Sequence, residues 1–270
     1  MNNLYEKNMI TNVDLKGLGE KLRDQYSQSQ PFPHSVIDGV LEDEVLDKVI
    51  SEFDSPEDNW HEFDTKYEKK FQKSDDKDLG PTAISVIQYM NSGSFLSFLE
   101  DITGIDCLIP DPYLVGGGLH KIEKGGKLGI HVDFNWHAKM RVFRRANVIV
   151  YLNRDWNEDY GGHLELWDGS KCCSVEKISP IFNRMVIFNT TEKSYHGHPL
   201  PMDCPKSRSR KSLALYYYTA NQSGEQSSQS HSTLFLDKNN RPVELKNKRS
   251  SVLIRLFSLP LAIVKRIRSW

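Results

Sequence analysis

The chain has 270 residues and a nearly balanced charge, with 35 Lys and Arg against 36 Asp and Glu. This length supports one sizeable hydrophobic core, and the balanced charge argues against nonspecific nucleic-acid binding by the whole chain. No apolar run approaches the roughly 18 residues of a spanning helix, and residues 1–15 show no secretory signal pattern. Because the four cysteines form no CxxC pair, we expect no disulfide scaffold or zinc ribbon, and a reduced, cytoplasmic compartment.

The first 105 residues are expected to form a helical and extended support region. Residues 54–81 are highly charged and interrupted by prolines, and are expected to form a loop with little regular structure. The spacing of apolar residues predicts helices over residues 13–28, 41–53 and 82–103.

From residue 106 to 222 the pattern changes to short β-branched and aromatic runs separated by Gly, Asn and Asp. Many short strands with turn signals are typical of a sandwich or barrel. Strands are predicted, for example, over residues 142–152, 163–167, 174–178, 184–189 and 212–219.

Residues 223–270 read as a hydrophilic linker followed by a basic amphipathic tail. From residue 241 onward there are eight Lys or Arg and one acid, a net charge of +7, which leaves −8 for the rest of the chain. A helical tail over 252–270, interrupted at Pro260, is consistent with peripheral membrane contact. Docking on the body of the protein or on a second subunit is the commoner role of such an apolar face.

The strongest chemical signal is the His131-Val132-Asp133 motif, with a further histidine downstream at His196 or His198. Residues two apart in a strand face the same side, so His131 and Asp133 can converge on one metal. A second histidine would complete the two-His-one-carboxylate set of non-haem Fe(II) oxygenases. Since an HxD triplet also occurs by chance, ordinary surface residues are the alternative interpretation.

Arg210 and Ser212 begin a strongly apolar strand. A guanidinium at that place is costly unless it meets an anion, and it grips a carboxylate at two points. Arg210 with Ser212 on the same face could hold the far end of a dicarboxylate while its near end chelates iron. A plain surface charge, beside Arg208, is the alternative for Arg210.

Residues 116–220 resemble the iron(II)/2-oxoglutarate-dependent dioxygenases of the prolyl 4-hydroxylase type. The resemblance rests on segments whose order and spacing agree: HVD at 131–133, YLNRDW at 151–156, GGHLEL at 161–166, ISPIFNRMVIF at 178–188, HGHP at 196–199 and RKSLALYYY at 210–218. It implies a mainly β protein with supporting α: a double-stranded β-helix, or jelly-roll and cupin-like core, with N-terminal helices and a C-terminal helical tail.

The resemblance also implies roles for individual residues. His131, Asp133 and His196 match the iron ligands, and Arg210 matches the residue that pairs with the distal carboxylate of 2-oxoglutarate. Tyr151 matches a tyrosine that helps to hold that carboxylate, and Ser212 is an additional donor. Two departures stand out: the family's tyrosine positions before the HxD motif hold Ile122 and Leu128, and the gap from His196 to Arg210 is slightly longer than in the animal enzymes.

Four further residues are candidates for substrate contact. Asn135 and Trp136 directly follow the metal motif, although a capped turn explains them equally well. Arg145 is the preferred one of three arginines before the strand that carries Tyr151, although a solvated strand entry is the commoner reading. His198 shares a strand face with His196 and faces either the substrate or the surface.

The implied function is hydroxylation of an unactivated C–H bond, coupled to decarboxylation of 2-oxoglutarate to succinate and CO2. The expected cofactors are Fe(II), 2-oxoglutarate and O2, with ascorbate as a further candidate. The expected substrate is a prolyl peptide or protein, or a small molecule or glycan precursor, and not a nucleic acid. The alternative is a non-catalytic sensor or binding protein that keeps the metal and 2-oxoglutarate on the same fold.

Overall fold

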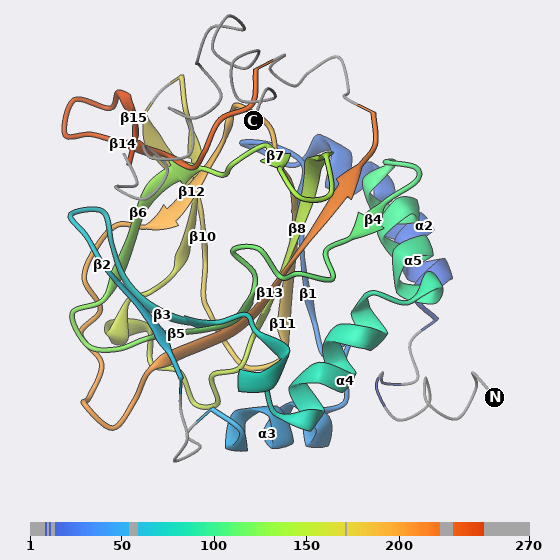
Figure 1. Cartoon of the computed structure of the whole chain (residues 1–270), viewed down its shortest axis with the longest axis horizontal. Helices are drawn as coiled ribbons and strands as arrows, with labels where there is room; N and C mark the ends of the chain where they lie inside the picture. Colours follow the sequence, from blue (N-terminus) through green and yellow to red (C-terminus); the bar gives the residue numbers. More distant parts are fainter. Residues whose placement is uncertain are drawn as a thin grey trace, which may run out of the picture.

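The computed structural model describes residues 9, 11, 14–53, 59–170, 172–221 and 229–245. Its α-helices come from the N-terminal part of the sequence, and in space they lie on one side of a large sheet (Figure 1). The segment expected as one helix over 82–103 is two helices, because the chain leaves the helical path at Asn91 and Ser92 caps the next helix. The α-helices are α2 (Leu15–Gln28), α3 (Asp43–Ser51), α4 (Pro81–Met90) and α5 (Gly93–Thr103).

All described strands belong to one antiparallel sheet, whose main path runs β1-β11-β8-β13-β5-β3-β6-β12-β9-β10. Short 3₁₀ turns are η1 (Asp76–Asp78) and η2 (Glu158–Tyr160). The strands are β1 (His34–Asp38), β2 (His61–Asp64), β3 (Glu68–Lys73), β4 (Ile109–Pro110), β5 (Gly118–Ile122), β6 (Lys127–Val132), β7 (Trp136–His137), β8 (Val142–Tyr151), β9 (Leu164–Asp168), β10 (Cys173–Ile178), β11 (Arg184–Asn189), β12 (Ser194–His198), β13 (Arg210–Thr219), β14 (Leu234–Leu236) and β15 (Pro242–Glu244).

The sheet curls into a nearly closed barrel, as the expected jelly-roll core requires. Strands β11, β8, β13 and β5 form one wall, and β6, β12, β9 and β10 form the other (Figure 1). Alternate residues of β8 face opposite sides. Val148 and Val150 pack outward against the helices in the main hydrophobic core, whereas Tyr151 belongs to a smaller inner cluster with Leu166 and Phe188. The helices thus support one wall and leave the barrel interior to the site.

The prediction of a loop over residues 54–81 is wrong for residues 61–73, which form the β2–β3 hairpin. Strand β3 pairs with both β5 and β6, so it bridges the two walls. Its inward side chains are polar, since Glu68, Lys70 and Gln72 line a cavity and not an apolar core. An alternation of polar with charged residues carries no hydrophobic signal, which explains why the sequence pattern missed this strand.

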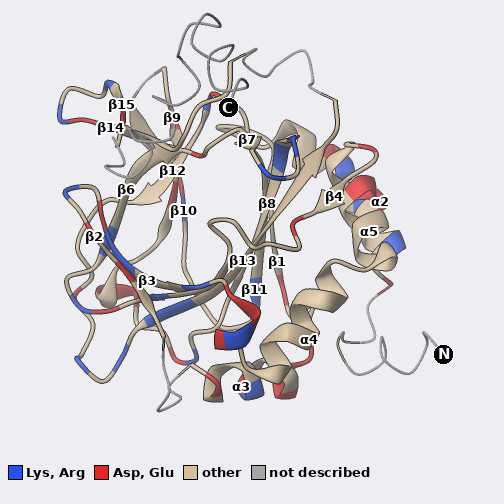
Figure 2. Ribbon diagram, viewed as in Figure 1, with Lys and Arg blue, Asp and Glu red and all other residues tan. Residues whose placement is uncertain are grey.

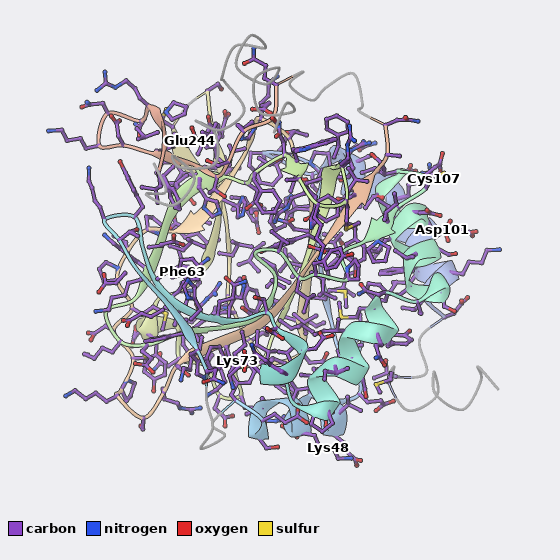
Figure 3. All side chains as sticks on the ribbon, in the orientation of Figure 1. Lys48, Phe63, Lys73, Asp101, Cys107 and Glu244 are labelled. Atoms are coloured by element: carbon purple, nitrogen blue, oxygen red, sulfur yellow. The ribbon has the colours of Figure 1, made fainter. Side chains whose placement is uncertain are left out.

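The sheet continues beyond residue 222. Strand β14 pairs with β6, placing Phe235 opposite His131, and β15 folds back on β14. Phe63 of β2 and Glu244 of β15 are labelled in Figure 3, and the hairpins that carry them border the same cavity. The tail expected over 252–270 lies outside the described residues.

Charged residues along β3 mix both signs, with lysines next to acids of the same hairpin (Figure 2). The four cysteines are free thiols. Within the described ranges, no helix has the length and apolar character needed to cross a membrane.

Candidate metal and cosubstrate site

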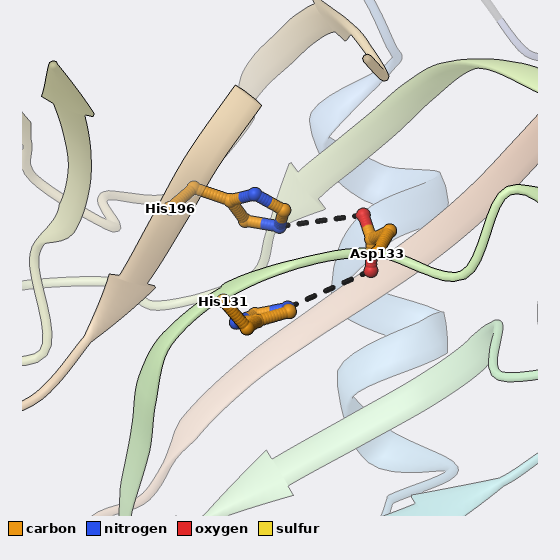
Figure 4. A group of neighbouring side chains, drawn as sticks. All are labelled: His131, Asp133 and His196. Atoms are coloured by element: carbon orange, nitrogen blue, oxygen red, sulfur yellow. Dashed lines mark ion pairs between the residues drawn. The ribbon is translucent and has the colours of Figure 1, made fainter. Parts of the chain in front are cut away.

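Three predicted ligands meet at one end of the barrel interior. His131 lies near the end of β6, Asp133 directly follows that strand, and His196 lies opposite His131 on β12. The Nε2 atom of His131 is 3.5 Å from Asp133 Oδ1, and the Nε2 atom of His196 is 3.5 Å from Asp133 Oδ2 (Figure 4). One ligand atom from each residue lies within 4.8 Å of the others, so a single ion can touch all three.

The backbone orients both imidazoles for metal binding. His131 Nδ1 donates to the carbonyl of Gly129 and His196 Nδ1 donates to the carbonyl of Ser194, both at 2.9 Å. Because a carbonyl only accepts, each Nδ1 carries the proton and each Nε2 offers a lone pair toward the centre. Such hydrogen bonds fix the tautomer and ring orientation of metal-binding histidines.

Asp133 is held by two buried side chains of β8. Its Oδ2 atom accepts a hydrogen bond from Asn147 at 2.8 Å and lies 3.1 Å from an Arg144 nitrogen. Burial alone would raise the pKa of Asp133, but Arg144, His196 and His131 together hold that pKa well below its ordinary value. The group is therefore an anionic carboxylate with Oδ1 directed toward His131.

Arg144 was not singled out by the sequence as a site residue. Its guanidinium is 1% exposed, lies 3.4 Å from the ring centroid of Tyr216, and also bonds Asn147 Oδ1. A β-bulge separates the pairs Tyr217–Ala146 and Tyr218–Arg144, which shifts the alternation by one residue. Arg144 consequently faces the interior, on the same side as Asn147.

Burial, reinforced by the neighbouring His131, lowers the pKa of His196 to about 4. The imidazole is therefore neutral near pH 7, which is the form that binds a metal. The site combines the imidazoles of His131 and His196 with one anionic carboxylate, the donor set of non-haem Fe(II) oxygenases.

A cavity of about 600 Å³ extends from this triad into the barrel. Arg210, 6% exposed, lies in its wall and donates from Nη2 to the Tyr151 hydroxyl at 3.0 Å. Burial raises the pKa of Tyr151, against the opposing effect of Arg210. The hydroxyl therefore stays protonated and keeps a donor. Ser212, also buried, lines the same cavity. Arg210 and Ser212 thus lie in the cavity wall, and Tyr151 is hydrogen-bonded to Arg210; that these residues hold the far end of a dicarboxylate stays a prediction.

Arg210 is positioned by Gly162. The arginine Nε donates to the Gly162 carbonyl at 2.7 Å. A Cβ at residue 162 would lie 3.0 Å from Arg210 Cδ, and the backbone there has φ +72°, so glycine permits this close approach. The alternative, Arg208, instead donates to the carbonyl of Arg154 near the surface.

The four candidate substrate residues are placed differently. His198 lines the cavity. Asn135 accepts from the backbone N–H of His231 and donates to Gln229, so it ties the segment before β14 to the end of β6. Trp136 packs edge-on against Phe143, and Arg145 donates to Thr219; none of these three lines the cavity.

Ile122 and Leu128, which replace the family's tyrosines, both line the cavity. Ile122 pairs directly with Arg210 across β5 and β13. The two positions that differ from the family motif therefore lie in the cavity wall, and Ile122 lies beside Arg210. This part of the wall is more apolar than the family motif implies.

Comparison with known proteins agrees with this geometry. Residues 117–218 match the model of the 2OG-Fe(II) oxygenase superfamily, and this segment contains all three predicted metal ligands and Arg210. This segment of the chain is therefore similar to the 2OG-Fe(II) oxygenase superfamily, in agreement with the motifs found in the sequence.

Individual relatives point the same way. The mouse prolyl 3-hydroxylase OGFOD1 is 28% identical over 199 residues, which cover 70% of this chain and 33% of the relative. The chain thus spans about a third of the length of that curated relative.

Two solved structures share the fold. A Trichoplax adhaerens prolyl hydroxylase, in complex with a hypoxia inducible factor peptide fragment, has a TM-score of 0.54 and 19% identity, covering 76% of this chain and 90% of that one. A Pseudomonas putida prolyl-4-hydroxylase has a TM-score of 0.56 and 15% identity, covering 75% and 100%.

Proposed function

We propose that the protein is an Fe(II)- and 2-oxoglutarate-dependent hydroxylase. The observation that carries this proposal is the buried triad of His131, Asp133 and His196 at one end of a cavity whose wall also holds Arg210. Iron and 2-oxoglutarate, when bound, supply the oxidation of an unactivated C–H bond by O2, with release of succinate, CO2 and the alcohol.

The residues of the chain would bind the metal and orient the cosubstrate. His131, Asp133 and His196 would hold the metal on one face and leave the opposite side open to ligands. Arg210, hydrogen-bonded to Tyr151 and Gly162, has further N–H groups for a carboxylate. The ring of Phe235 lies 5.3 Å from that of His131 and limits the access of water on that side.

We propose a prolyl residue in a peptide or protein as the substrate. The similarity to mouse OGFOD1 and to the Trichoplax enzyme supports this choice, since both of those proteins are prolyl hydroxylases. The β2–β3 hairpin and the segment around Ser232, Thr233 and Phe235 both line the cavity, and we expect an extended peptide to enter between them. The complete metal triad favours turnover over a purely sensory role.

The test is succinate formation by the Fe(II)-loaded protein with a library of proline-containing peptides, followed by mass spectrometry of each peptide. We expect succinate release that depends on peptide and the gain of one oxygen atom on a prolyl residue. Matched peptides with alanine at that position serve as controls. Peptide-independent background alone, in protein that binds both iron and 2-oxoglutarate, would contradict the prolyl substrate.

A further inference from the structure

His198 is a buried imidazole without a hydrogen-bond partner among the described residues. Its side chain is 3% exposed, yet neither Nδ1 nor Nε2 is bonded. Leaving a buried polar group without a hydrogen-bond partner is energetically unfavourable. Since both nitrogens belong to a side chain of the cavity wall, a ligand in the cavity is the natural partner.

The strand register places His198 away from the metal end. On β12 it follows His196 by two residues, so the two share a face and lie about 7 Å apart along the strand. Across the β6 pairing His196 lies opposite His131, whereas His198 lies opposite Leu128. His198 therefore lies deeper in the barrel than the three metal ligands, on the face that they share.

Arg210 lies at a comparable depth on the opposite wall. It pairs with Ile122 at the end of β5, and Ser212 pairs with Tyr151 at the end of β8. The metal-end residues of the same strands are Asn147 and Tyr216, which pair with each other. Arg210 and His198 thus face the same deep part of the cavity from two sides.

We propose that His198 is a cosubstrate-binding residue that donates an N–H to the distal carboxylate of 2-oxoglutarate, next to Arg210 and Tyr151. An imidazole carries at least one N–H in either protonation state, so the bond does not depend on its titration. A carboxylate has two oxygens and accepts several hydrogen bonds. The contact satisfies the imidazole only when cosubstrate is bound.

This inference rests on the proposed function, and a pair of ligands separates the two. 2-Oxoglutarate and 2-oxovalerate share a five-carbon chain and the metal-binding 2-oxo acid, but 2-oxovalerate lacks the distal carboxylate. Calorimetric titration of the Mn(II)-loaded protein, without turnover, gives a Kd for each ligand. The variants are His198→Ala and His198→Gln, which keeps an amide donor, with His61→Ala on the exposed face of β2 as control.

We expect His198→Ala to raise the Kd of 2-oxoglutarate about tenfold or more and to leave the Kd of 2-oxovalerate unchanged. His198→Gln should recover part of the loss, and it also tests the proposal if the alanine variant does not fold. An unchanged Kd for 2-oxoglutarate in both variants, or an equal loss for both ligands, would overturn the role of His198. Failure of the wild type to bind 2-oxoglutarate would instead overturn the proposed function, and this inference with it.

Discussion

At the scale of single residues, the metal site depends on side chains that never touch the metal. Asp133 is held by Asn147 and Arg144, and the two histidines are held by backbone carbonyls. These contacts fix which oxygen and which nitrogens point to the centre. Supporting contacts of this kind are typically worth 10–100-fold in metal affinity.

Replacing Asn147 tests this support. Asn147→Leu removes the 2.8 Å hydrogen bond to Asp133 and leaves Arg144 as the supporting partner of the carboxylate outside the metal triad. We expect a roughly 10–100-fold weaker binding of Fe(II) or Mn(II), measured by anaerobic titration. Asn239→Ala, in an exposed turn, is the control. An unchanged metal affinity in a folded Asn147→Leu protein would show that Asp133 does not need the Asn147 hydrogen bond.

A second residue-scale prediction concerns pH. Burial, with the charge of Lys70, lowers the pKa of His120 from 6.5 to about 3. Between these values the unfolded chain binds more protons at this position, so stability rises with pH. His120→Gln should therefore lose less stability than wild type between about pH 7.5 and pH 5, as followed by urea unfolding of the metal-free protein. An equal or larger acid loss in the variant would refute this.

The candidate ligands could be predicted because their spacing is a strand signal, and Arg210 because a guanidinium before an apolar strand is unusual. The position of Arg144 beside Asp133 could not be predicted. If the side chains of β8 alternated regularly back from Tyr151, Arg145 would face the barrel interior. The bulge near Ala146 instead turns Arg144 inward. A bulge is set by the partner strand β13, which local sequence does not reveal.

At the scale of elements, the site requires the backbones of β6 and β12 to lie unusually close to each other at Gly197. A Cβ at Gly197 would lie 2.7 Å from the Gly129 carbonyl oxygen and 2.8 Å from that of Leu128. Both obstacles are backbone atoms, so only a shift of one strand could relieve the clash. Such a shift would move His196 away from His131.

We therefore expect Gly197→Ala to lose most metal binding and to lower the melting temperature. Gly93→Ala is a matched control, because a Cβ at that helical position meets nothing within 4 Å, and alanine favours a helix by up to about 1 kcal/mol. Differential scanning fluorimetry with and without Mn(II) measures both effects. Retention of a wild-type metal-dependent shift in Gly197→Ala would contradict the close-approach account.

Element boundaries could be predicted where apolar periodicity is strong, as for α2, α3 and β11. The β2–β3 hairpin could not, because its inward residues face a polar cavity. The pairing of β14 with β6 was equally hidden, since a three-residue strand has no periodic signal.

At the scale of the whole molecule, a helix-backed wall and a second wall of the same sheet enclose the candidate site. The main core lies between the helices and one wall, while a small apolar cluster and the polar cavity occupy the interior. The resemblance to prolyl hydroxylases predicted this architecture. The pattern of short strands by itself indicated only a β-sandwich or a β-barrel. Core packing and ligand binding are therefore separated in space, so polar residues lie inside the barrel without weakening the main core.

The most direct test of the account is anaerobic titration of the metal-free protein with Fe(II) and 2-oxoglutarate, monitored by the visible charge-transfer absorption of the complex. The account predicts a band in wild type that is lost in His131→Ala and shifted to higher 2-oxoglutarate concentration in Arg210→Ala. Absence of the band in folded, metal-loaded wild type would contradict the assignment of this site.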